Sequence, residues 1–247
     1  MSAPSRVVID GEVVRRPAQG WTPTIHLLLA HLRRQGLAGV PAPMGVRGDL
    51  EEVSFLPGDA GAACWPHQVG EAGVVSAARL LRSIHEAGRG WRGPPESAWA
   101  RPASPEAEVI CHGDPGPWNM VWRDGRAVGM IDWDLAYPGR ALEDVAYALE
   151  WLAPFCSDAE AVRWRAFAGP PDRPARIATF TRAYGMEGTA GMVDAVIARQ
   201  RATIDVTRDL ATRGVQPQAQ WVSEGLLDVQ AERVRWSERN RHLFLET

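Results

Sequence analysis

The sequence contains no lysine, so all 27 of its basic residues are arginines. A lysine's role in binding must therefore fall to a planar guanidinium, which binds phosphate oxygens as a fork. Cysteine is also scarce: Cys64, Cys111 and Cys156 are odd in number, widely spaced and form no C-x-x-C motif. This usage argues against a disulfide framework or a cysteine metal knuckle and is typical of a reducing compartment. We expect a cytoplasmic protein.

Long apolar runs and a strong net charge are missing as well. No run approaches the ~20 apolar residues of a membrane span, and residues 1–12 lack the apolar core of a signal peptide. The net charge of −3 leaves no basic stripe for nucleic acid and no polybasic segment for a membrane surface. We therefore expect neither nucleic acid nor a membrane as a partner. A chain of 247 residues can form one large domain or two lobes that share a cleft.

The first elements that the sequence predicts are two β-strands. Residues 6–9 (RVVI) and 12–15 (EVVR) flank Asp10-Gly11, a pair that favours a tight turn between two β-branched runs. The sequence therefore predicts an N-terminal β-hairpin.

A helix and two further strands are expected next. Thr22-Pro23 supplies an N-cap and a first helical residue, and the helix should stop near Gly36. Strands are predicted around 44–47 and 51–56, and Pro57-Gly58 ends them. We place a lobe boundary here, with a strand-rich N-terminal lobe at 1–58 and a helical C-terminal lobe at 59–247.

The second lobe is predicted to be mainly helical. Val74, Ala78, Leu81 and His85 mark one helix face, and the Gly-, Pro- and Ser-rich segment 88–107 predicts irregular structure. Further helices are expected at 141–153, 158–168, 174–184, 190–212 and 217–240. The fold class is therefore α+β, with a small strand-rich lobe before a larger helical one.

One segment of this lobe, CHGDPGPWNMVWRDGRAVGMIDWD at 111–134, concentrates four aspartates, a histidine and an asparagine. A strand leads into a loop that carries Asp114, and a hairpin with an Asp124-Gly125 turn follows. The hairpin brings Asp132 back toward Asn119. Together with Asp114, these side chains offer hard oxygen ligands to a divalent cation, which can bind a phosphate at the same time.

These residues resemble a known signature. His112-Gly113-Asp114, Asn119 five positions after the aspartate, and the run IDWD at 131–134 resemble the aminoglycoside phosphotransferase and choline kinase superfamily, small-molecule relatives of the protein kinases. Segment 143–146 (EDVA) is similar to that family's D-x-A helix start, and 54–58 (SFLPG) to its interlobe hinge. The resemblance implies a two-lobed, protein-kinase-like fold with a truncated N-terminal β lobe. It also implies Mg²⁺-dependent transfer of the γ-phosphate of ATP or GTP to a small-molecule hydroxyl.

Roles follow from the resemblance. Asp114 would orient the acceptor hydroxyl and accept its proton, and His112 would support the loop by hydrogen bonding. Asn119 and Asp132 would hold Mg²⁺ ions that bridge the nucleotide phosphates. Gly113 stands where protein kinases have the arginine that anchors a phosphorylated activation loop, so no such switch is expected.

The acceptor site is less well marked. Asp134 would line it or brace the metal loop, and Trp118 or Trp133 would form its floor. The acceptor itself is expected to be an aminoglycoside-like or other antibiotic, a sugar or an amino alcohol. Nothing in the sequence indicates the oligomeric state.

Three departures from the family lie in the N-terminal lobe. Arg16, or alternatively Arg15, must replace the family's phosphate-binding lysine, and His26 occupies the place of the glutamate that holds this lysine. About five residues precede the first strand, too few for a glycine-rich loop, so an open site with weak nucleotide binding is expected.

Each assignment has a plainer alternative. Asp114, Asn119 and Asp132 could cap loops, and Arg16 could be a solvated arginine at a strand end. His26 could be an ordinary helix histidine, and the two tryptophans could be core residues. The EDVA aspartate, Asp144, is interpreted as a helix-start cap. For the whole protein, the alternatives are a catalytically silent pseudokinase, an interaction protein, or an enzyme that transfers a nucleotidyl group.

Overall fold

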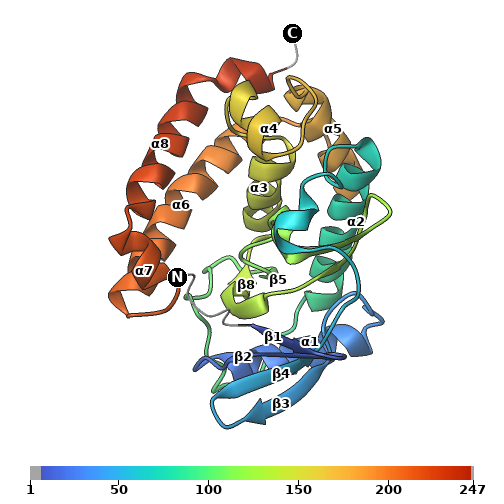
Figure 1. The fold of residues 1–247 in the computed structure, drawn as a ribbon, viewed down its shortest axis with the longest axis vertical. Helices are drawn as coiled ribbons and strands as arrows, with labels where there is room; N and C mark the ends of the chain where they lie inside the picture. The colour runs from blue at the N-terminus through green and yellow to red at the C-terminus, as the bar shows by residue number, and fades with distance from the viewer. Residues whose placement is uncertain (1–6, 246–247) are drawn as a thin grey trace.

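The computed structural model describes residues 7–245, so Arg6 of the predicted first strand lies outside the described residues. The chain opens with a four-stranded antiparallel sheet in the order β1-β2-β4-β3, at one end of the molecule (Figure 1). Its elements are β1 (Val8–Asp10), β2 (Val13–Pro17), α1 (Thr22–Arg34), β3 (Pro43–Arg47) and β4 (Leu50–Ser54). All of the strands expected before Pro57 are confirmed.

Two of the predicted boundaries in this sheet region shift by one residue. Asp10 pairs with Val13, so the hairpin turn consists of Gly11 and Glu12, and Gly11 supplies the left-handed φ of +59°. Thr22 is the first residue of α1 rather than its cap, and its Oγ1 accepts a hydrogen bond from the Gln19 N–H at 2.8 Å.

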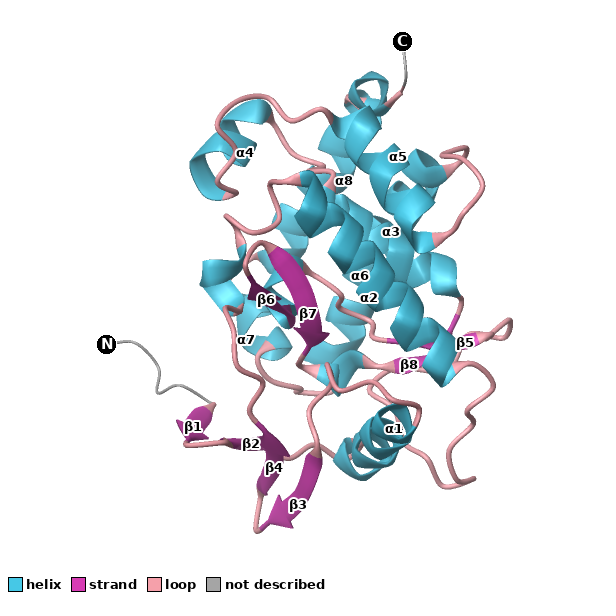
Figure 2. Ribbon diagram, turned by 90° about the vertical axis from the view of Figure 1, so that its right-hand side faces the viewer, coloured by secondary structure: helices cyan, strands magenta, loops and turns pink. Residues whose placement is uncertain are grey.

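The remaining elements form the helical part of the molecule, with two small sheets at its border with the first sheet (Figures 1 and 2). The elements are η1 (Gly61–Cys64), α2 (Glu71–Gly88), β5 (Val109–Cys111), η2 (Pro117–Asn119), β6 (Met120–Arg123), β7 (Arg126–Met130), η3 (Trp133–Leu135), β8 (Tyr137–Gly139), α3 (Ala141–Leu152), α4 (Asp158–Trp164), α5 (Arg173–Tyr184), α6 (Met192–Thr212), α7 (Gln218–Ser223), α8 (Leu226–Arg239) and η4 (Arg241–Phe244).

The helix predictions are confirmed except at two places. The segment predicted as one helix at 217–240 is divided into α7 and α8 at Gly225, whose φ of +93° no continuous helix can contain. Helix α4 ends at Trp164 rather than near 168, because Ala166 also has a positive φ. In the β6–β7 hairpin, Asp124 and Gly125 both have positive φ, as a primed turn requires.

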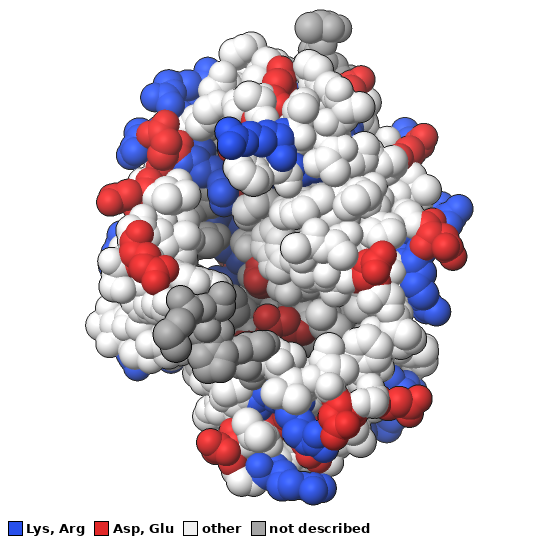
Figure 3. Space-filling model, in the orientation of Figure 1, with Lys and Arg blue, Asp and Glu red and all other residues white. Residues whose placement is uncertain are grey.

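A continuous core joins the two parts. It runs from the apolar face of α1, through α2 and the β6–β7 hairpin, into α3, α5 and α6, and includes the buried side chains Leu28, Leu81, Trp122, Leu149 and Phe180. On the face shown in Figure 3, acidic and basic side chains are interspersed rather than gathered in one stripe. Among residues 7–245, no helix combines the length and hydropathy that a membrane crossing needs.

Candidate active site

The loop between β5 and β6 is held by a buried carboxylate. Asp144, in the first turn of α3, accepts hydrogen bonds from the backbone N–H groups of His112 (2.6 Å) and Gly113 (2.9 Å). The Nε2 of His85 lies 3.1 Å from the same carboxylate, and both side chains are almost completely buried. Burial by itself raises the pKa of Asp144, but His85 and the other hydrogen-bonded groups outweigh it and hold the pKa below its usual value.

This contact corrects the interpretation of Asp144 as a helix-start cap. The capping contact of α3 belongs to Glu143, whose side chain accepts a hydrogen bond from the Arg140 N–H at 3.2 Å. Asp144 instead turns inward and binds the loop that carries Asp114. An acidic residue in a first helical turn suits either use, so its position in the sequence could not separate the two.

Asp114 has one oxygen committed and one available. Its Oδ2 accepts a hydrogen bond from Asn119 Nδ2 at 2.9 Å, whereas its Oδ1 is buried and makes no hydrogen bond of normal geometry among the described residues. Burial raises the pKa of Asp114 to about 7, and the nearby negative charge of Asp132 adds to the rise. The side chains of Tyr147 and Trp118 lie close enough to the carboxylate to offset part of this rise in its pKa. The carboxylate is therefore poised to exchange a proton near neutral pH.

The His112 side chain supports this loop by hydrogen bonds. Its Nε2 lies 2.9 Å from the carbonyl oxygen of Ile131, and its Nδ1 accepts the Asp114 N–H at 3.3 Å. Its ring meets the edge of Trp133 at a centroid distance of 4.8 Å. Burial lowers the pKa of His112, so the ring is neutral and donates through Nε2. These contacts link the loop to the residue that precedes Asp132.

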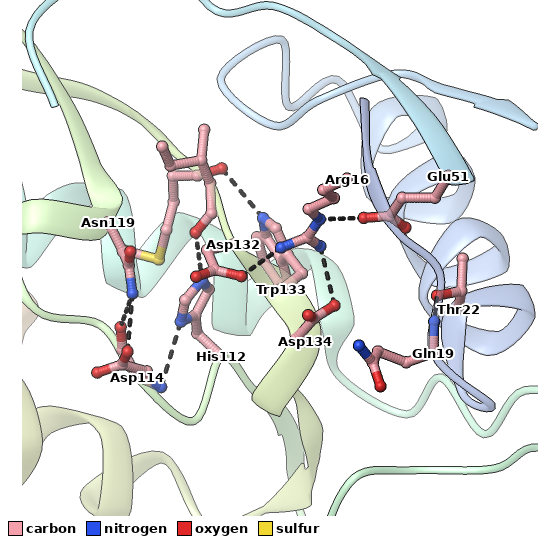
Figure 4. A network of polar contacts seen from close by, with 12 residues as sticks. Arg16, Gln19, Thr22, Glu51, His112, Asp114, Asn119, Asp132, Trp133 and Asp134 are labelled. Carbon is pink, nitrogen blue, oxygen red and sulfur yellow. Dashed lines mark hydrogen bonds and ion pairs between the residues drawn. The ribbon is translucent and has the colours of Figure 1, made fainter. Parts of the chain in front are cut away.

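Arg16 faces this loop from the first sheet (Figure 4). Its guanidinium pairs with Glu51, with Asp132, and with Asp134 at 2.9 Å. Burial lowers the pKa of Arg16, but the three carboxylates raise it more, so its charge is permanent. Arg16 is thus no solvated strand-end arginine. Arg15 pairs with Asp10 and Glu52 instead, which places Arg16 and not its neighbour at the candidate site.

Glu51 is a residue that the sequence interpretation missed. It lies directly opposite Arg16 in the β2–β4 pairing, and its side chain is almost completely buried. His26, assigned to the position of the family's glutamate, lies beside Glu51 with Nε2 and Oε2 3.3 Å apart. The acid that holds the cation therefore comes from a strand and not from α1. Only the strand register, which the sequence does not state, pairs Glu51 with Arg16.

The predicted nucleotide-binding residues share one cavity. Arg16, Asn119 and Asp132 line a space of about 330 Å³ whose other walls are largely apolar and come from β1, β2, β4, the 54–58 segment and β6. The hydrogen bonds of the Asn119 side chain use Nδ2, so its Oδ1 can face a ligand. Asp132 is in the left-handed region, at φ +60°, and its side chain is half exposed. An amide oxygen and a carboxylate are hard donors that fit Mg²⁺.

A second cavity of about 480 Å³ lies against α3, α6, α7 and α8, and Trp118 lines both cavities. Of the three candidate acceptor residues, Trp118 alone reaches it. Trp133 is buried, donates from Nε1 to the Met130 carbonyl at 3.0 Å and lines the first cavity. Asp134 pairs with Arg16 on the side of the first cavity. The contact of Asp134 fits its alternative role, bracing the metal loop, and the acceptor-site roles of Asp134, Trp118 and Trp133 stay predictions.

Arg199 is a further residue that the motifs did not indicate. This buried arginine of α6 donates from Nη2 to the Gly113 carbonyl at 2.7 Å, and its guanidinium lies over the Tyr147 ring at 4.8 Å. The guanidinium of Arg199 thereby binds the backbone of the loop at Gly113. The contact joins residues 86 positions apart, so no local pattern could have revealed it.

Comparisons with known proteins agree with this architecture. The model of the phosphotransferase enzyme family matches residues 91–192. The trifolitoxin immunity protein of Rhizobium leguminosarum bv. trifolii is 36% identical over 149 residues, which are 58% of this chain and 56% of that protein. The match thus spans little more than half of the relative.

Two solved structures illustrate the likeness in fold. Aminoglycoside 2'-phosphotransferase-IIIa, in its GDP complex, is 14% identical with a TM-score of 0.59, over 98% of this chain and 92% of its own. A choline/ethanolamine kinase family protein from Mesorhizobium loti is 14% identical with a TM-score of 0.55, over 97% and 85%. The predicted α+β, protein-kinase-like fold is confirmed.

Proposed function

The chain combines the fold of the aminoglycoside phosphotransferase and choline kinase superfamily with a match to the phosphotransferase enzyme family, and we propose that it is a small-molecule O-phosphotransferase. It moves the γ-phosphoryl group of ATP or GTP to a hydroxyl of its acceptor. In this proposal residues 1–58 form the nucleotide-binding lobe and residues 59–247 carry the catalytic loop. The observation that carries it is the buried Oδ1 of Asp114, which makes no hydrogen bond of normal geometry among residues 7–245 and lies close to Asn119, Asp132 and the tryptophan shared by the two cavities.

Asp114 acts on the acceptor. Its Oδ1 accepts the hydrogen bond of the acceptor hydroxyl and takes the proton as the oxygen bonds to the γ-phosphorus. The bond between that phosphorus and its bridging oxygen breaks, and a nucleoside diphosphate leaves. Asn119 holds Asp114 in position through the 2.9 Å contact to Oδ2, while Asp144, His112 and Arg199 fix the loop backbone.

The nucleotide occupies the 330 Å³ cavity. Its base lies among the apolar walls, and its phosphates face Arg16, Asn119 and Asp132. Mg²⁺, when bound through Asn119 and Asp132, neutralises the charge that develops on the phosphoryl oxygens. Arg16 adds a permanent cation with several donors on the same side.

The test is a screen of hydroxylated small molecules with ATP and with GTP in the presence of Mg²⁺, followed by mass analysis of the products. Trifolitoxin and aminoglycosides belong in the screen, because the similar proteins are named for them. A product that has gained one phosphoryl group supports the proposal. Gain of a nucleotidyl group instead would identify a different transferase, and nucleotide binding without any transfer across the screen would identify a pseudokinase.

A further inference from the structure

The residues that line the cavity against α3, α6, α7 and α8 indicate which kind of ligand would fit there. It opens on a hollowed face of the molecule (Figure 3). Its volume of about 480 Å³ is that of a small-molecule site. Tyr147 and Trp118 line it and also lie near Asp114, where their side chains influence the pKa of the carboxyl. A molecule in this cavity therefore lies beside the proposed catalytic base.

The charges of the cavity are few and partly compensated. Its charged lining residues are Glu150, Glu224 and Arg233. Arg233 Nη1 lies 3.6 Å from Glu150 Oε1, and its guanidinium lies over the Trp151 ring at 4.6 Å. Glu224 accepts a hydrogen bond from Gln220 at 2.8 Å. A ligand with several ammonium groups would find one arginine and at most two carboxylates here, too few counter-charges to replace its hydration.

The walls are instead aromatic and apolar. Trp118 and Trp151 meet edge to face at a centroid distance of 4.5 Å. Trp221 and Val229 line the same cavity while 46% and 56% of their surface is exposed, so a ligand would cover apolar area that now faces water. Burial of such area favours a flat or ring-bearing apolar body.

Several buried polar atoms in the wall have no hydrogen-bond partner among the described residues: Trp151 Nε1, Gln230 Oε1 and both amide atoms of Gln200. Gln200 on α6 is only 4% exposed, and neither its Oε1 nor its Nε2 makes a hydrogen bond of normal geometry among the described residues. Its amide does lie close enough to Glu150 to offset part of the rise that burial causes in the pKa of that carboxyl. A buried amide normally has both atoms satisfied, because an unsatisfied donor or acceptor is costly. A ligand that carries both a donor and an acceptor, as an amide does, would satisfy both atoms of Gln200 at once.

From these observations, and resting on the proposed function, we infer that the acceptor is a hydroxyl compound with a flat, mainly apolar body, an amide-like group and at most one positive charge. The amide pairs with Gln200, the ring packs against the tryptophans, and the hydroxyl reaches Asp114. A polyamine is excluded as the preferred acceptor. This distinguishes the chain from a phosphotransferase whose substrate is a polycationic aminoglycoside.

The experiment compares three probes by calorimetric titration near physiological salt. N-acetylphenylalaninol carries a ring, a neutral amide and a hydroxyl; phenylalaninol replaces the amide by an ammonium group; kanamycin is a polyamine. The acetylated probe should bind tightest and kanamycin weakest. Gln200→Leu should weaken the acetylated probe by roughly 10-fold, the scale of a lost buried hydrogen bond, and should change phenylalaninol by less than about 2-fold. Gln35→Leu, an exposed position at the end of α1 and outside the lining, should change neither.

The outcomes separate the two claims. Tighter binding of kanamycin by the wild-type protein, or a Gln200→Leu variant that binds all three probes unchanged, would overturn the inference. Because the wild-type ranking needs no variant, the inference can be tested even if Gln200→Leu does not fold. A phosphoryl-transfer assay with the same probes then tests whether the bound compound is also an acceptor. Transfer chiefly to kanamycin would overturn the inference and uphold the proposed function. The expected binding ranking without transfer to any acceptor would uphold the inferred ligand chemistry and overturn the proposed function.

Discussion

Two charged clusters contact the two ends of the 111–134 segment and differ in the groups that hold them. The first, His85 and Asp144, is buried and bound largely to backbone N–H groups of residues 112 and 113. The second, Arg16 with its three carboxylates, joins the first sheet to the start of η3 by side chains alone, and the side chain of Asp132 is 50% exposed. A backbone-bound buried carboxylate cannot change partners without moving the loop, whereas side-chain pairs at a cavity wall can exchange them.

The comparison implies a division of labour. The buried cluster fixes the position of Asp114 before any ligand arrives, which is the preorganisation that catalysis requires. The Arg16 cluster holds its charges near the proposed phosphate site, where a bound nucleotide can replace one ion pair by another. Variants in the first cluster should therefore affect stability, and variants in the second should affect ligand binding.

The largest expected effect is on stability. Asp144→Ala leaves His85 and two loop N–H groups without their acceptor, so the free energy of unfolding should fall by about 3–5 kcal/mol, the usual cost of breaking a buried pair. Asp144→Asn keeps an acceptor oxygen and should cost less. Urea unfolding measures both, with the exposed ion-pair variant Asp209→Ala as a control that should change little.

The same cluster predicts a pH dependence with a definite sign. The pKa of Asp144 is lower in the folded protein than its usual value of about 3.9. Its contribution is therefore present above that usual value and is lost as the pH falls through the lowered pKa. Below about pH 4 the unfolding free energy of the wild type should fall more steeply than that of Asp144→Asn. Equal slopes would mean that this carboxylate does not hold the loop.

The next effect concerns metal and nucleotide. Asp132→Ala should weaken Mg²⁺-dependent nucleotide binding by at least about 100-fold, because loss of even an outer-shell partner of a metal site costs roughly 10- to 100-fold. Asp134→Ala, which removes the neighbouring partner of Arg16, should cost less than about 10-fold. Calorimetry with and without Mg²⁺ measures both. Unchanged binding by Asp132→Ala would remove Asp132 from the proposed site.

A smaller effect distinguishes two adjacent arginines. Arg16→Ala should lower nucleotide affinity by ~10- to 100-fold, the scale of one charge-assisted hydrogen bond to phosphate. Arg15→Ala is the matched control, because its ion pairs lie away from the cavity. Its affinity should stay within about 2-fold of the wild type. A larger loss from Arg15→Ala than from Arg16→Ala would reverse the assignment.

The smallest expected effect concerns Trp133. Trp133→Phe removes the hydrogen bond to the Met130 carbonyl and should cost about 1 kcal/mol of stability. The KM for the acceptor should stay within about 2-fold, since Trp133 does not line the second cavity. A KM that rises tenfold at unchanged stability would place Trp133 in the acceptor site.

The features that the sequence predicted correctly are those that depend on local patterns. The turns at Gly11 and Gly125, the apolar faces of α1 and α2, and the spacing of Asp114, Asn119 and Asp132 all depend on neighbours a few residues apart. The break at Gly225 was missed because Val222 and Leu226 continue the helical period on either side of it.

The missed residues have partners far along the chain. Glu51 meets Arg16 through strand register, Asp144 meets the loop 31 and 32 positions earlier, and Arg199 reaches Gly113 across 86 positions. A glutamate in a strand, an aspartate in a first helical turn and an arginine in a helix are all common, so none of the three stands out in the sequence. Only the packed structure shows that Asp144 and Arg199 bind the loop at residues 112 and 113, while Glu51 holds the arginine that lines the cavity.

The central claim, that Asp114 is the base for a phosphoryl transfer, is tested most directly by comparing Asp114→Asn with the wild type in one titration and one turnover assay. With an acceptor from the screen, turnover should fall by ~10²-fold or more, the scale of a lost general base, while the affinity for Mg²⁺–nucleotide stays nearly unchanged. Parallel losses of turnover and nucleotide affinity, or turnover that survives the substitution, would contradict the claim.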